Sequence, residues 1–400
     1  MPYAWIVVAL LVPVALLNYL DRQMLAAMKF SVMTDITGIG SEANWGKILA
    51  LFKWTYAFLS PVGGYLADRY SKRHVISFSL LAWSAITWAT GQVTNFEQLL
   101  WTRAIMGLSE ALYIPAALAL LADYHPGPTR SRAVGLHQIG IYCGVILGGF
   151  SGYVADDPSL GWRSLFVACG IAGMLYSLPL FWTLRNAAVA ATAQVRLSAR
   201  SAFDGLLRNR NFILLVLYFT LPAMAGWIVR DWMPAILKAE FGIGQGRAGV
   251  SATLYWMVAA ALSAFAGGWL ADRWVKVNPR GRIYTSAMGM ALITLAMMGV
   301  GYSPQTGSLT VAIAFLVLFG IGWGSFDANN MPILCQVARP ELRATGYGVM
   351  NMVSISCGGL ADWGFGMLRD AQVPLLVIFG LFASIALFSI VTVLLIRPSS

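Results

Sequence analysis

The sequence predicts an all-helical membrane protein with twelve transmembrane helices in two bundles of six. Of its 400 residues, 58% are hydrophobic and only 11% are charged, and the mean hydropathy is +0.69. These values lie well outside those of soluble domains, so lipid is the expected solvent for most of the chain. Long apolar runs recur along the whole sequence, and two short motifs appear once in each half, which indicates an internal repeat.

Twelve stretches reach the roughly 20 apolar residues that a helix needs to cross the hydrocarbon layer. The first is too long for a signal peptide and has no small-residue cleavage site. The stretches are about 3–32, 44–68, 74–92, 96–122, 133–155, 164–184, 211–237, 248–271, 283–302, 309–335, 345–368 and 373–396. The long polar connection 185–210 divides them, so we expect an amino-terminal bundle (1–184), a cytoplasmic linker (185–210) and a carboxy-terminal bundle (211–400).

The basic residues are distributed unevenly between the two sides of this arrangement. Of 27 Lys and Arg residues, 17 lie in the tails, the linker and the connections on one side, and 5 lie on the opposite side. Cytoplasmic loops carry such an excess, which predicts that both termini are cytoplasmic in a multi-pass protein of the cell (inner) membrane. The formal charge of +10 therefore reflects membrane topology rather than nucleic-acid binding.

Two sequence matches indicate that the halves are related. Gly-Tyr-Leu-Ala-Asp-Arg at 64–69 recurs as Gly-Trp-Leu-Ala-Asp-Arg at 268–273, which is 204 positions later. Arg-Ala-Val-Gly at 132–135 recurs as Arg-Ala-Thr-Gly at 343–346, which is 211 positions later. Pseudo-symmetric six-helix halves are the architecture of secondary transporters that bind solutes near mid-membrane.

At these residues the chain resembles the major facilitator superfamily, and the resemblance covers nearly its whole length. The loop motif of that superfamily is matched by Gly64, Asp68, Arg69, Lys72 and Arg73, with a second copy at Gly268, Asp272 and Arg273. Its fourth-helix pattern is matched by Arg103, Gly107 and Ala111. The resemblance implies that the loop-motif residues form a conformational latch between the two bundles in the outward-open state.

Two groups within the superfamily are similar to this chain: the anion:cation symporters of sugar acids and organic anions, and the Spinster-like carriers of lysolipids and sphingolipids. The residues shared with both are Asn18, Tyr19, Leu20, Asp21, Arg22, Arg103, Glu110, Ala111 and Pro115. The resemblance implies that Asp21 and Glu110 couple protons and that Arg22 contacts an anionic substrate. Small residues at 144–152 without the proline of many proton-coupled exporters favour uptake over export.

Four charged residues of the first and fourth predicted helices form a candidate coupling network. A charge at the bilayer centre costs about 2.5–3.5 kcal/mol, so such residues usually have a function. Arg103 and Glu110 are two turns apart on one helix face, at about 10 Å, and cannot pair without a third group. Asp21 and Arg22 point in different directions and supply that group. Proton coupling needs a carboxylate in a dehydrated site and a cation with an exchangeable partner. A static buried salt-bridge network is the alternative.

Further polar residues are candidates for binding the substrate. Lys53 adds a second cation beside Arg22 if it faces the cavity, and otherwise it snorkels to the membrane boundary; the same choice applies to Lys29. Arg230 and Asp231 form either a surface pair or part of the site, and His137 is either a proton carrier or a structural residue. The other expected substrate-binding residues are Tyr19, Tyr56, Gln138, Tyr142, Asp327, Asn329, Asn330 and Asn351.

These features predict a proton-coupled symporter that takes up a small organic anion, such as a sugar acid, by alternating access. A Spinster-like lysolipid or sphingolipid carrier is the alternative. A membrane enzyme or sensor is a third possibility, but the sequence has no Walker loop, no HExxH and no Ser-His-Asp arrangement. The four cysteines and three histidines form no metal or disulfide pattern. We therefore expect no cofactor, metal or nucleic acid, and a monomer in the bilayer whose partners are the solute and protons.

Overall fold

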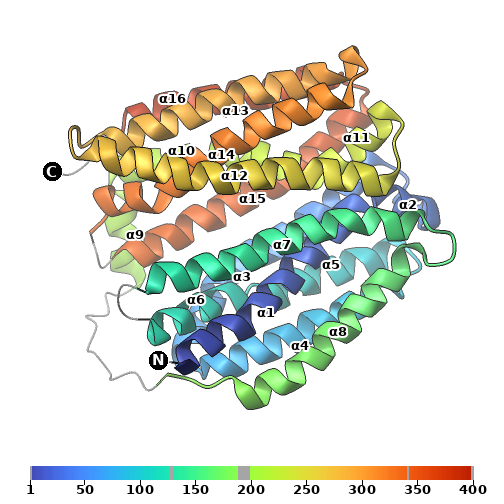
Figure 1. The fold of residues 1–400 in the computed structure, drawn as a ribbon, viewed down its shortest axis with the longest axis horizontal. Helices are drawn as coiled ribbons and strands as arrows, with labels where there is room; N and C mark the ends of the chain where they lie inside the picture. The colour runs from blue at the N-terminus through green and yellow to red at the C-terminus, as the bar shows by residue number, and fades with distance from the viewer. Residues whose placement is uncertain (1, 126–128, 188–198, 340–341, 398–400) are drawn as a thin grey trace. The chain divides into compact units, whose positions relative to one another are not determined.

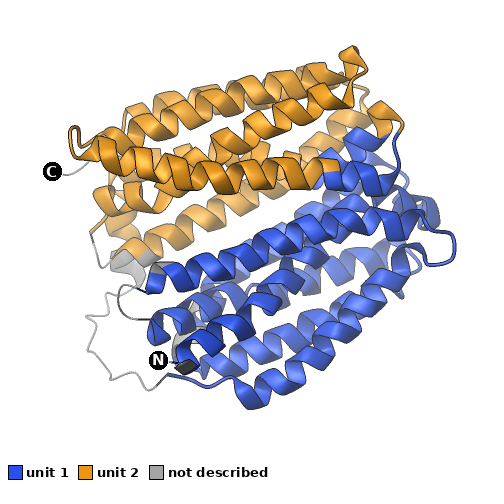
Figure 2. Ribbon diagram, viewed as in Figure 1, with its two compact units in different colours: residues 1–192, 231–238, 243–250 blue, residues 193–230, 239–242, 251–400 orange. Residues whose placement is uncertain are grey.

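The structure is a computed structural model that describes residues 2–125, 129–187, 199–339 and 342–397. Every regular element in these ranges is a helix (Figure 1), so the all-helical prediction is confirmed for them. The chain divides into two compact units (Figure 2). Unit 1 contains residues 1–192, 231–238 and 243–250, and unit 2 contains residues 193–230, 239–242 and 251–400. Residues 188–198 of the predicted linker lie outside the described ranges.

Unit 1 is built on helices from the first half of the sequence. Its helices are α1 (Pro2–Ala27), α2 (Lys29–Asp35), η1 (Thr37–Ile39), α3 (Glu42–Arg69), α4 (Lys72–Thr90), α5 (Phe96–Glu110), α6 (Tyr113–Tyr124), α7 (Arg130–Asp156), α8 (Gly161–Thr183) and most of α11 (Met233–Phe241). Ser41 and Asn95 start α3 and α5 by accepting hydrogen bonds from the backbone N–H of Asn44 and Gln98, at 3.1 and 2.9 Å. α1 packs closely on α7, because a Cβ at Gly140 would lie only 2.7 Å from the carbonyl oxygen of Val12.

Unit 2 is built on the remaining helices. They are α9 (Ala199–Leu207), α10 (Arg210–Asp231), α12 (Gln245–Val275), α13 (Gly281–Thr306), α14 (Leu309–Val337), α15 (Arg343–Asp370) and α16 (Leu375–Leu394), with the first residues of α12 grouped in unit 1. Gly289 and Gly322 allow α13 and α14 to touch, since a Cβ on either would lie 2.5–2.7 Å from the other's carbonyl oxygen. Small residues therefore set the helix spacing in this unit too.

Three predicted spans are interrupted rather than continuous, which corrects the sequence interpretation. The stretch 96–122 breaks before α6, and 211–237 breaks between α10 and α11 at Trp232. Pro115 and Pro234 lie two to three residues after these breaks, where a proline has no N–H donor for a continuous helix. The stretch 3–32 breaks at Met28, where nothing in the sequence explains it. Met28 and Trp232 are 204 positions apart, which is also the separation of the loop-motif copies.

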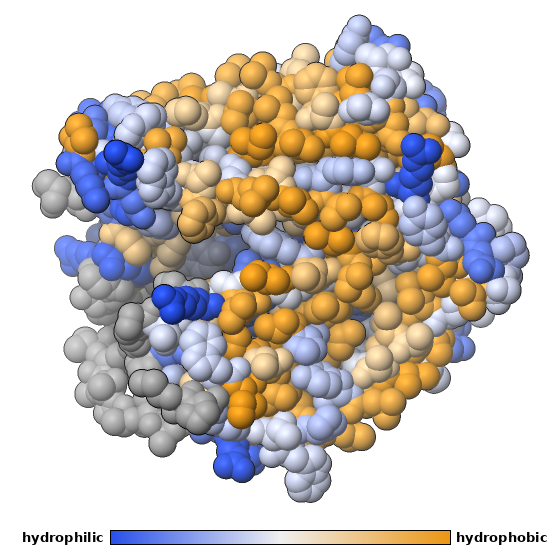
Figure 3. All heavy atoms as spheres, in the orientation of Figure 1, coloured by the Kyte–Doolittle hydropathy of each residue, from blue (hydrophilic) through white to orange (hydrophobic). Residues whose placement is uncertain are grey.

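Nine helical segments in the described part of the chain are long and apolar enough to cross a membrane. The predicted spans 44–68, 74–92 and 345–368 lie in α3, α4 and α15, which have 28, 19 and 28 residues but more polar side chains. In Figure 3, hydrophobic residues gather along the middle of the helices that face the viewer, and hydrophilic residues lie toward their ends. The count of twelve spans and the side on which the termini lie remain predictions.

Candidate functional site

The centre of the candidate site is an ion pair between α1 and α5 in unit 1. The Nε atom of Arg22 donates to Glu110 Oε2 at 2.6 Å. Glu110 has no exposed side-chain surface and Arg22 has 13%. Arg22 Nη2 and Glu110 Oε1 are buried and have no hydrogen-bond partner among the described residues. The pair is therefore joined by one hydrogen bond, although an arginine and a carboxylate can form two in parallel.

Three aromatic rings surround the Arg22 guanidinium. Its Cζ atom lies 4.7 Å from the ring centroid of Tyr19, 4.8 Å from that of Phe52 and 4.7 Å from that of Tyr56. Each distance is within the range of a cation–π interaction. Tyr19 and Tyr56 were expected at the site. Phe52 was missed, although it lies four residues before Tyr56 and therefore on the same face of a helix.

The second carboxylate and the second arginine lie close to this pair. Asp21 is buried and accepts a hydrogen bond from the Thr87 hydroxyl, and Arg103 Nη2 donates to Thr90 Oγ1 at 3.0 Å. Arg103 also interacts electrostatically with Asp21 and Glu110. The structure thus brings together all four charged residues of the predicted network. The two threonines on α4 were missed, because a hydroxyl in an apolar helix gives no distinctive sequence signal.

A glycine sets the distance between the aromatic rings and the carboxylate. A Cβ on Gly107 of α5 would lie 2.5 Å from the carbonyl oxygen of Phe52, so no larger residue fits there without moving α3. Gly107 is one turn before Glu110 on α5. The close approach therefore fixes Phe52 and Tyr56 next to the Arg22–Glu110 pair.

The two intramembrane lysines are buried and paired rather than directed to the membrane boundary. Lys53 forms an ion pair with Asp231, and Lys29 forms one with Glu42. Lys29 Nζ also lies 4.8 Å from a ring centroid of Trp232. All these residues belong to unit 1. Since Asp231 is 8% exposed and binds Lys53, the expectation of a surface pair between Arg230 and Asp231 is wrong.

The other amino-terminal candidates lie on α7. Gln138 and Tyr142 are partly buried and one turn apart, and Tyr142 packs against the hydrophobic core of unit 1. His137 is buried, and its Nε2 forms a hydrogen bond of 2.8 Å with the Tyr113 hydroxyl. This contact fits the structural interpretation of His137 better than the proton-carrier interpretation.

The carboxy-terminal candidates lie on α14 and α15 in unit 2. Asn330 Nδ2 donates to Asp327 Oδ1 at 3.2 Å, while Asn329 Nδ2 donates to the backbone carbonyl of Ser325 at 2.9 Å. Asp327 is exposed, both asparagines are buried, and Asn351 on α15 is partly buried. The structure therefore groups Asp327 with Asn330, whereas the amide of Asn329 is bound to its own helix.

Asp327 has further neighbours, and one of them is Arg230, for which the sequence left both a surface pair and a part in the site open. Arg230 interacts electrostatically with Asp327 and lies 5.5 Å from the ring of Trp227. The ring of Trp323 lies 5.5 Å from that of Phe326, the residue before Asp327. Unit 2 thus has an acidic and an amide group next to aromatic rings.

The predicted latch residues make contacts within their own units. Arg69 Nη1 donates to the Tyr65 hydroxyl at 2.6 Å, and the backbone N–H of Arg73 donates to Asn186 Oδ1 at 3.1 Å. In the second copy, Asp272 Oδ1 accepts from Arg282 Nη2 at 2.7 Å. Arg273 lies 5.2 Å from the Trp269 ring, and a Cβ on Gly268 would meet no atom within 4 Å. Gly64 and Asp68 lie in α3, and the side chain of Asp68 is outside the described part.

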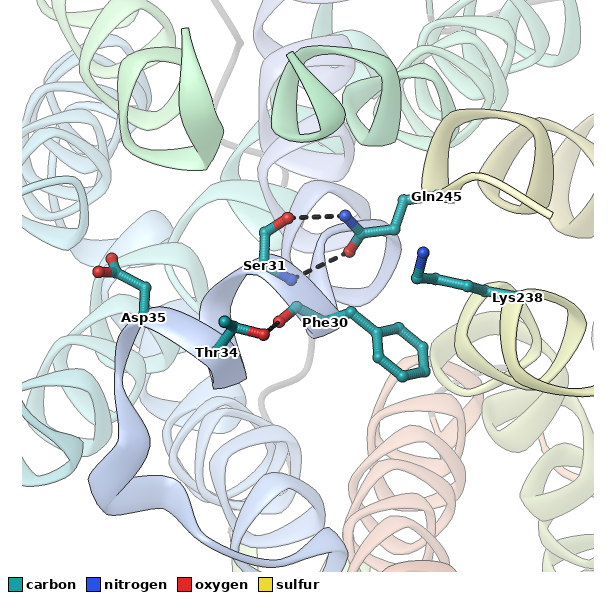
Figure 4. Close-up of a pocket in the computed structure, with 6 residues that line it drawn as sticks. All are labelled: Phe30, Ser31, Thr34, Asp35, Lys238 and Gln245. Atoms are coloured by element: carbon teal, nitrogen blue, oxygen red, sulfur yellow. Dashed lines mark hydrogen bonds between the residues drawn. The ribbon is translucent and has the colours of Figure 1, made fainter. Parts of the chain in front are cut away.

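A separate pocket of about 620 Å³ in unit 1 contains none of the predicted site residues (Figure 4). Gln245 Nε2 donates to Ser31 Oγ at 2.6 Å on its wall and to Asp156 Oδ1 at 2.8 Å. The residues that line the pocket are Phe30, Ser31, Thr34, Asp35, Lys238 and Gln245. The Ser31 and Gln245 side chains bind each other, so these two polar groups of the pocket are already paired.

Comparison with solved structures shows the fold. The chain superimposes with a TM-score of 0.78 on a bacterial homologue of the human lysosomal transporter Spinster, at 21% identity and with 99% of this chain and 96% of that chain covered. A D-xylose-proton symporter gives a TM-score of 0.77 at 16% identity, with 99% and 98% covered.

Sequence comparison gives relatives of several kinds. An MFS-type efflux pump of Mycolicibacterium smegmatis is 28% identical over 92% of this chain and 85% of that protein. A probable L-galactonate transporter of Escherichia coli (strain K12) is 25% identical over 89% and 81%. Protein spinster homolog 1 of Rattus norvegicus is 32% identical over 61% of this chain. The matched part covers about half (48%) of that protein.

The family model described as Major Facilitator Superfamily matches residues 11–361. That range covers most of both units and all candidate site residues. Members of this superfamily are transporters and not enzymes, and the many apolar helices agree with a multi-pass membrane protein. The chain therefore belongs to the major facilitator superfamily of membrane transporters.

Proposed function

We propose that this transporter is a proton-coupled symporter that takes up a small organic anion, such as a sugar acid, by alternating access. The observation that carries the proposal is the single hydrogen bond between Arg22 and Glu110. Arg22 Nη2 can donate to a substrate carboxylate, and Glu110 Oε1 can take a proton. Both atoms are buried and without a hydrogen-bond partner in the described part of the chain.

Coupling follows from competition for the Arg22 guanidinium. A substrate carboxylate on Arg22 weakens the attraction between the guanidinium and Glu110, so Glu110 takes a proton more easily. By thermodynamic reciprocity, a proton on Glu110 then strengthens substrate binding by the same factor. Asp21, with its Oδ1 atom also unpartnered among the described residues, is the second proposed proton site. Arg103 balances the charge of the two carboxylates.

The proposed substrate class rests on the other polar groups. Tyrosine hydroxyls and amides suit the hydroxyl groups of a sugar acid, and aromatic rings suit its apolar face. The galactonate transporters among the relatives support this class. Lys53 would act as a second cation when released from Asp231. The residues proposed to bind the solute are Tyr19, Arg22, Lys53, Tyr56, Gln138 and Tyr142 in unit 1, and Asp327, Asn329, Asn330 and Asn351 in unit 2.

The wider arrangement is part of the same proposal. We infer two six-helix bundles, 1–184 and 211–400, with the linker and both termini in the cytoplasm. We place the protein in the inner membrane as a monomer. The latch residues Gly64, Asp68, Arg69, Arg73, Gly268, Asp272 and Arg273 are proposed to act in the conformational change rather than in binding.

A lipid carrier of the Spinster kind is the second candidate. Its support is the 32% identity to spinster homolog 1 and the TM-score of 0.78 to a bacterial Spinster homologue. The buried charged network does not exclude a lysolipid, because a phosphate group also binds an arginine. Direct transport measurements decide between the two substrates.

The test is counterflow by the purified protein in proteoliposomes, with galactonate, gluconate, a dicarboxylate and lysophosphatidylcholine as solutes. We expect exchange of a sugar acid, and accumulation when the outside is made acidic. Liposomes with Arg163→Ala serve as a control, because that change breaks another ion pair of unit 1, with Asp35, away from the network. Exchange of the lysolipid alone would reject the sugar-acid proposal in favour of the lipid carrier.

A further inference from the structure

The aromatic rings around Arg22 stabilise its buried charge without using the N–H groups that a substrate would need. A buried cation must be compensated, and hydrogen bonds from all of its N–H groups would leave none for a substrate. A ring attracts the cation through its π electrons and accepts no conventional hydrogen bond in doing so. The three rings therefore stabilise the charge of Arg22 while its Nη2 atom stays available.

Phe52 differs from the other two rings because it has no hydroxyl group. It contributes only its π face and its apolar surface to the guanidinium at 4.8 Å. Its ring also stacks on Tyr56, with centroids 6.1 Å apart and planes 29° apart. The carbonyl group of Phe52 lies directly against Gly107, so α3 and α5 are in close contact at the residue that carries the ring.

We infer that Phe52 is a positioning residue that keeps the Arg22–Glu110 pair joined by a single hydrogen bond. This inference rests on the proposed function, since it explains how the substrate donor and the proton acceptor stay available. Without the ring, the guanidinium is free to turn until Nη2 meets Glu110 Oε1. Arg22 and Glu110 are then joined by two parallel hydrogen bonds, which is the stronger arrangement in a site without water. A substrate would have to break that second hydrogen bond before it could bind.

The test compares Phe52→Leu, which keeps an apolar side chain without the ring, with Phe52→Tyr, which keeps the ring. Galactonate counterflow gives KM and the maximal rate for each variant. We expect Phe52→Leu to raise KM about tenfold with little change in maximal rate, and Phe52→Tyr to stay within about threefold of the unmodified protein. Phe58→Leu is the matched control, because Phe58 is on the same helix and 65% exposed.

A second measurement needs no substrate. Dicyclohexylcarbodiimide reacts with protonated carboxyl groups in apolar sites, and mass spectrometry quantifies its adduct on the peptide that contains Glu110. We expect Phe52→Leu to slow this labelling several-fold and Phe52→Tyr to leave it nearly unchanged. The Glu110→Gln variant identifies the adduct that belongs to this residue.

These outcomes separate the inference from the proposed function. If galactonate is not exchanged by the unmodified protein, yet labelling of Glu110 still depends on the ring, the proposed substrate class fails and the positioning role stands. If Phe52→Leu and Phe52→Tyr change KM and labelling equally, the ring is ordinary packing and the inference is wrong. Equal behaviour of Phe52→Leu and Phe58→Leu would overturn it as well.

Discussion

The polar groups of the two units differ in how they are held. In unit 1, Asp21, Arg103 and Glu110 are buried and the charges of each sign are balanced within a few side chains. In unit 2, Asp327 is exposed and accepts one hydrogen bond from the Asn330 amide, and Asp362 is a single buried acidic residue among those described. A fixed buried network suits proton coupling, whereas an accessible polar group suits contact with a solute. The difference therefore supports separate roles for the two units.

The repeat itself does not extend to these charges. At the offset of 204 residues, Asp21 and Arg22 correspond to Ala225 and Gly226 in unit 2. A Cβ on Gly226 would clash with the ring of Trp323, so this position serves helix packing instead. The halves share their loop motif and one helix break, but only the first half has the proposed coupling residues. The two halves thus share sequence motifs but have different side chains at the positions of Asp21 and Arg22.

We expect the largest effect from substitution of Arg22. If uptake does not fall, the comparison between the two units is wrong. We expect Arg22→Ala to reduce uptake at least 100-fold with normal expression, because the substrate loses its cation, and hydrogen bonds to charged groups contribute about 1.5–3 kcal/mol each. Arg22→Lys should rescue poorly, since an ammonium does not reproduce the planar guanidinium. Radiolabelled uptake and membrane immunoblots measure both. Near-normal uptake would remove Arg22 from the site.

Glu110→Gln tests whether coupling resides in unit 1. Because this change imitates a permanently protonated residue, the variant should exchange substrate in counterflow but lose accumulation driven by a pH gradient. Both assays are run in the same proteoliposomes, with Glu42→Gln as a control that alters the separate ion pair with Lys29. Retained accumulation would exclude Glu110 as the coupling site and leave Asp21.

Substitution of Asn330 tests the role given to unit 2. We expect Asn330→Ala to raise KM for the solute about three- to tenfold, because one hydrogen bond contributes about 1 kcal/mol and the neighbouring Asp327 loses its amide partner. The number of protons moved per solute should not change. A fluorescent pH probe beside tracer uptake measures that ratio. An altered ratio would show that unit 2 shares in coupling.

The smallest effect on binding should come from the loop motif. We expect Asp68→Asn to slow turnover several-fold and to change substrate affinity less than twofold, because the latch acts on the conformational change. Asp272→Asn, in the second copy, removes the negative charge that pairs with Arg282 and shows whether both copies contribute. Transport rate and binding by thermal shift are measured together. A large loss of affinity at normal turnover would contradict the latch role.

The sequence by itself determined the class of the fold and the four charged residues that meet in unit 1, whereas the relation between its halves stays a prediction. Apolar runs, repeated motifs and charges within apolar stretches are local features of the sequence, so they can be recognised without knowing how the helices pack. The breaks before α6 and α11 were not predicted, because the hydropathy pattern is continuous across both of them.

Only the tertiary structure decided which charges meet. Arg22 reaches Glu110 over 88 positions and Lys53 reaches Asp231 over 178, and each pairing depends on how two helices are rotated and how closely they pack. The rotation of α3 brought Phe52 to Arg22, and Gly107 set the distance. Hydropathy does not show how each helix is rotated, so Thr87 and the partner of Lys53 could not be predicted. Phe52 had only an indirect signal, its spacing of four residues from Tyr56.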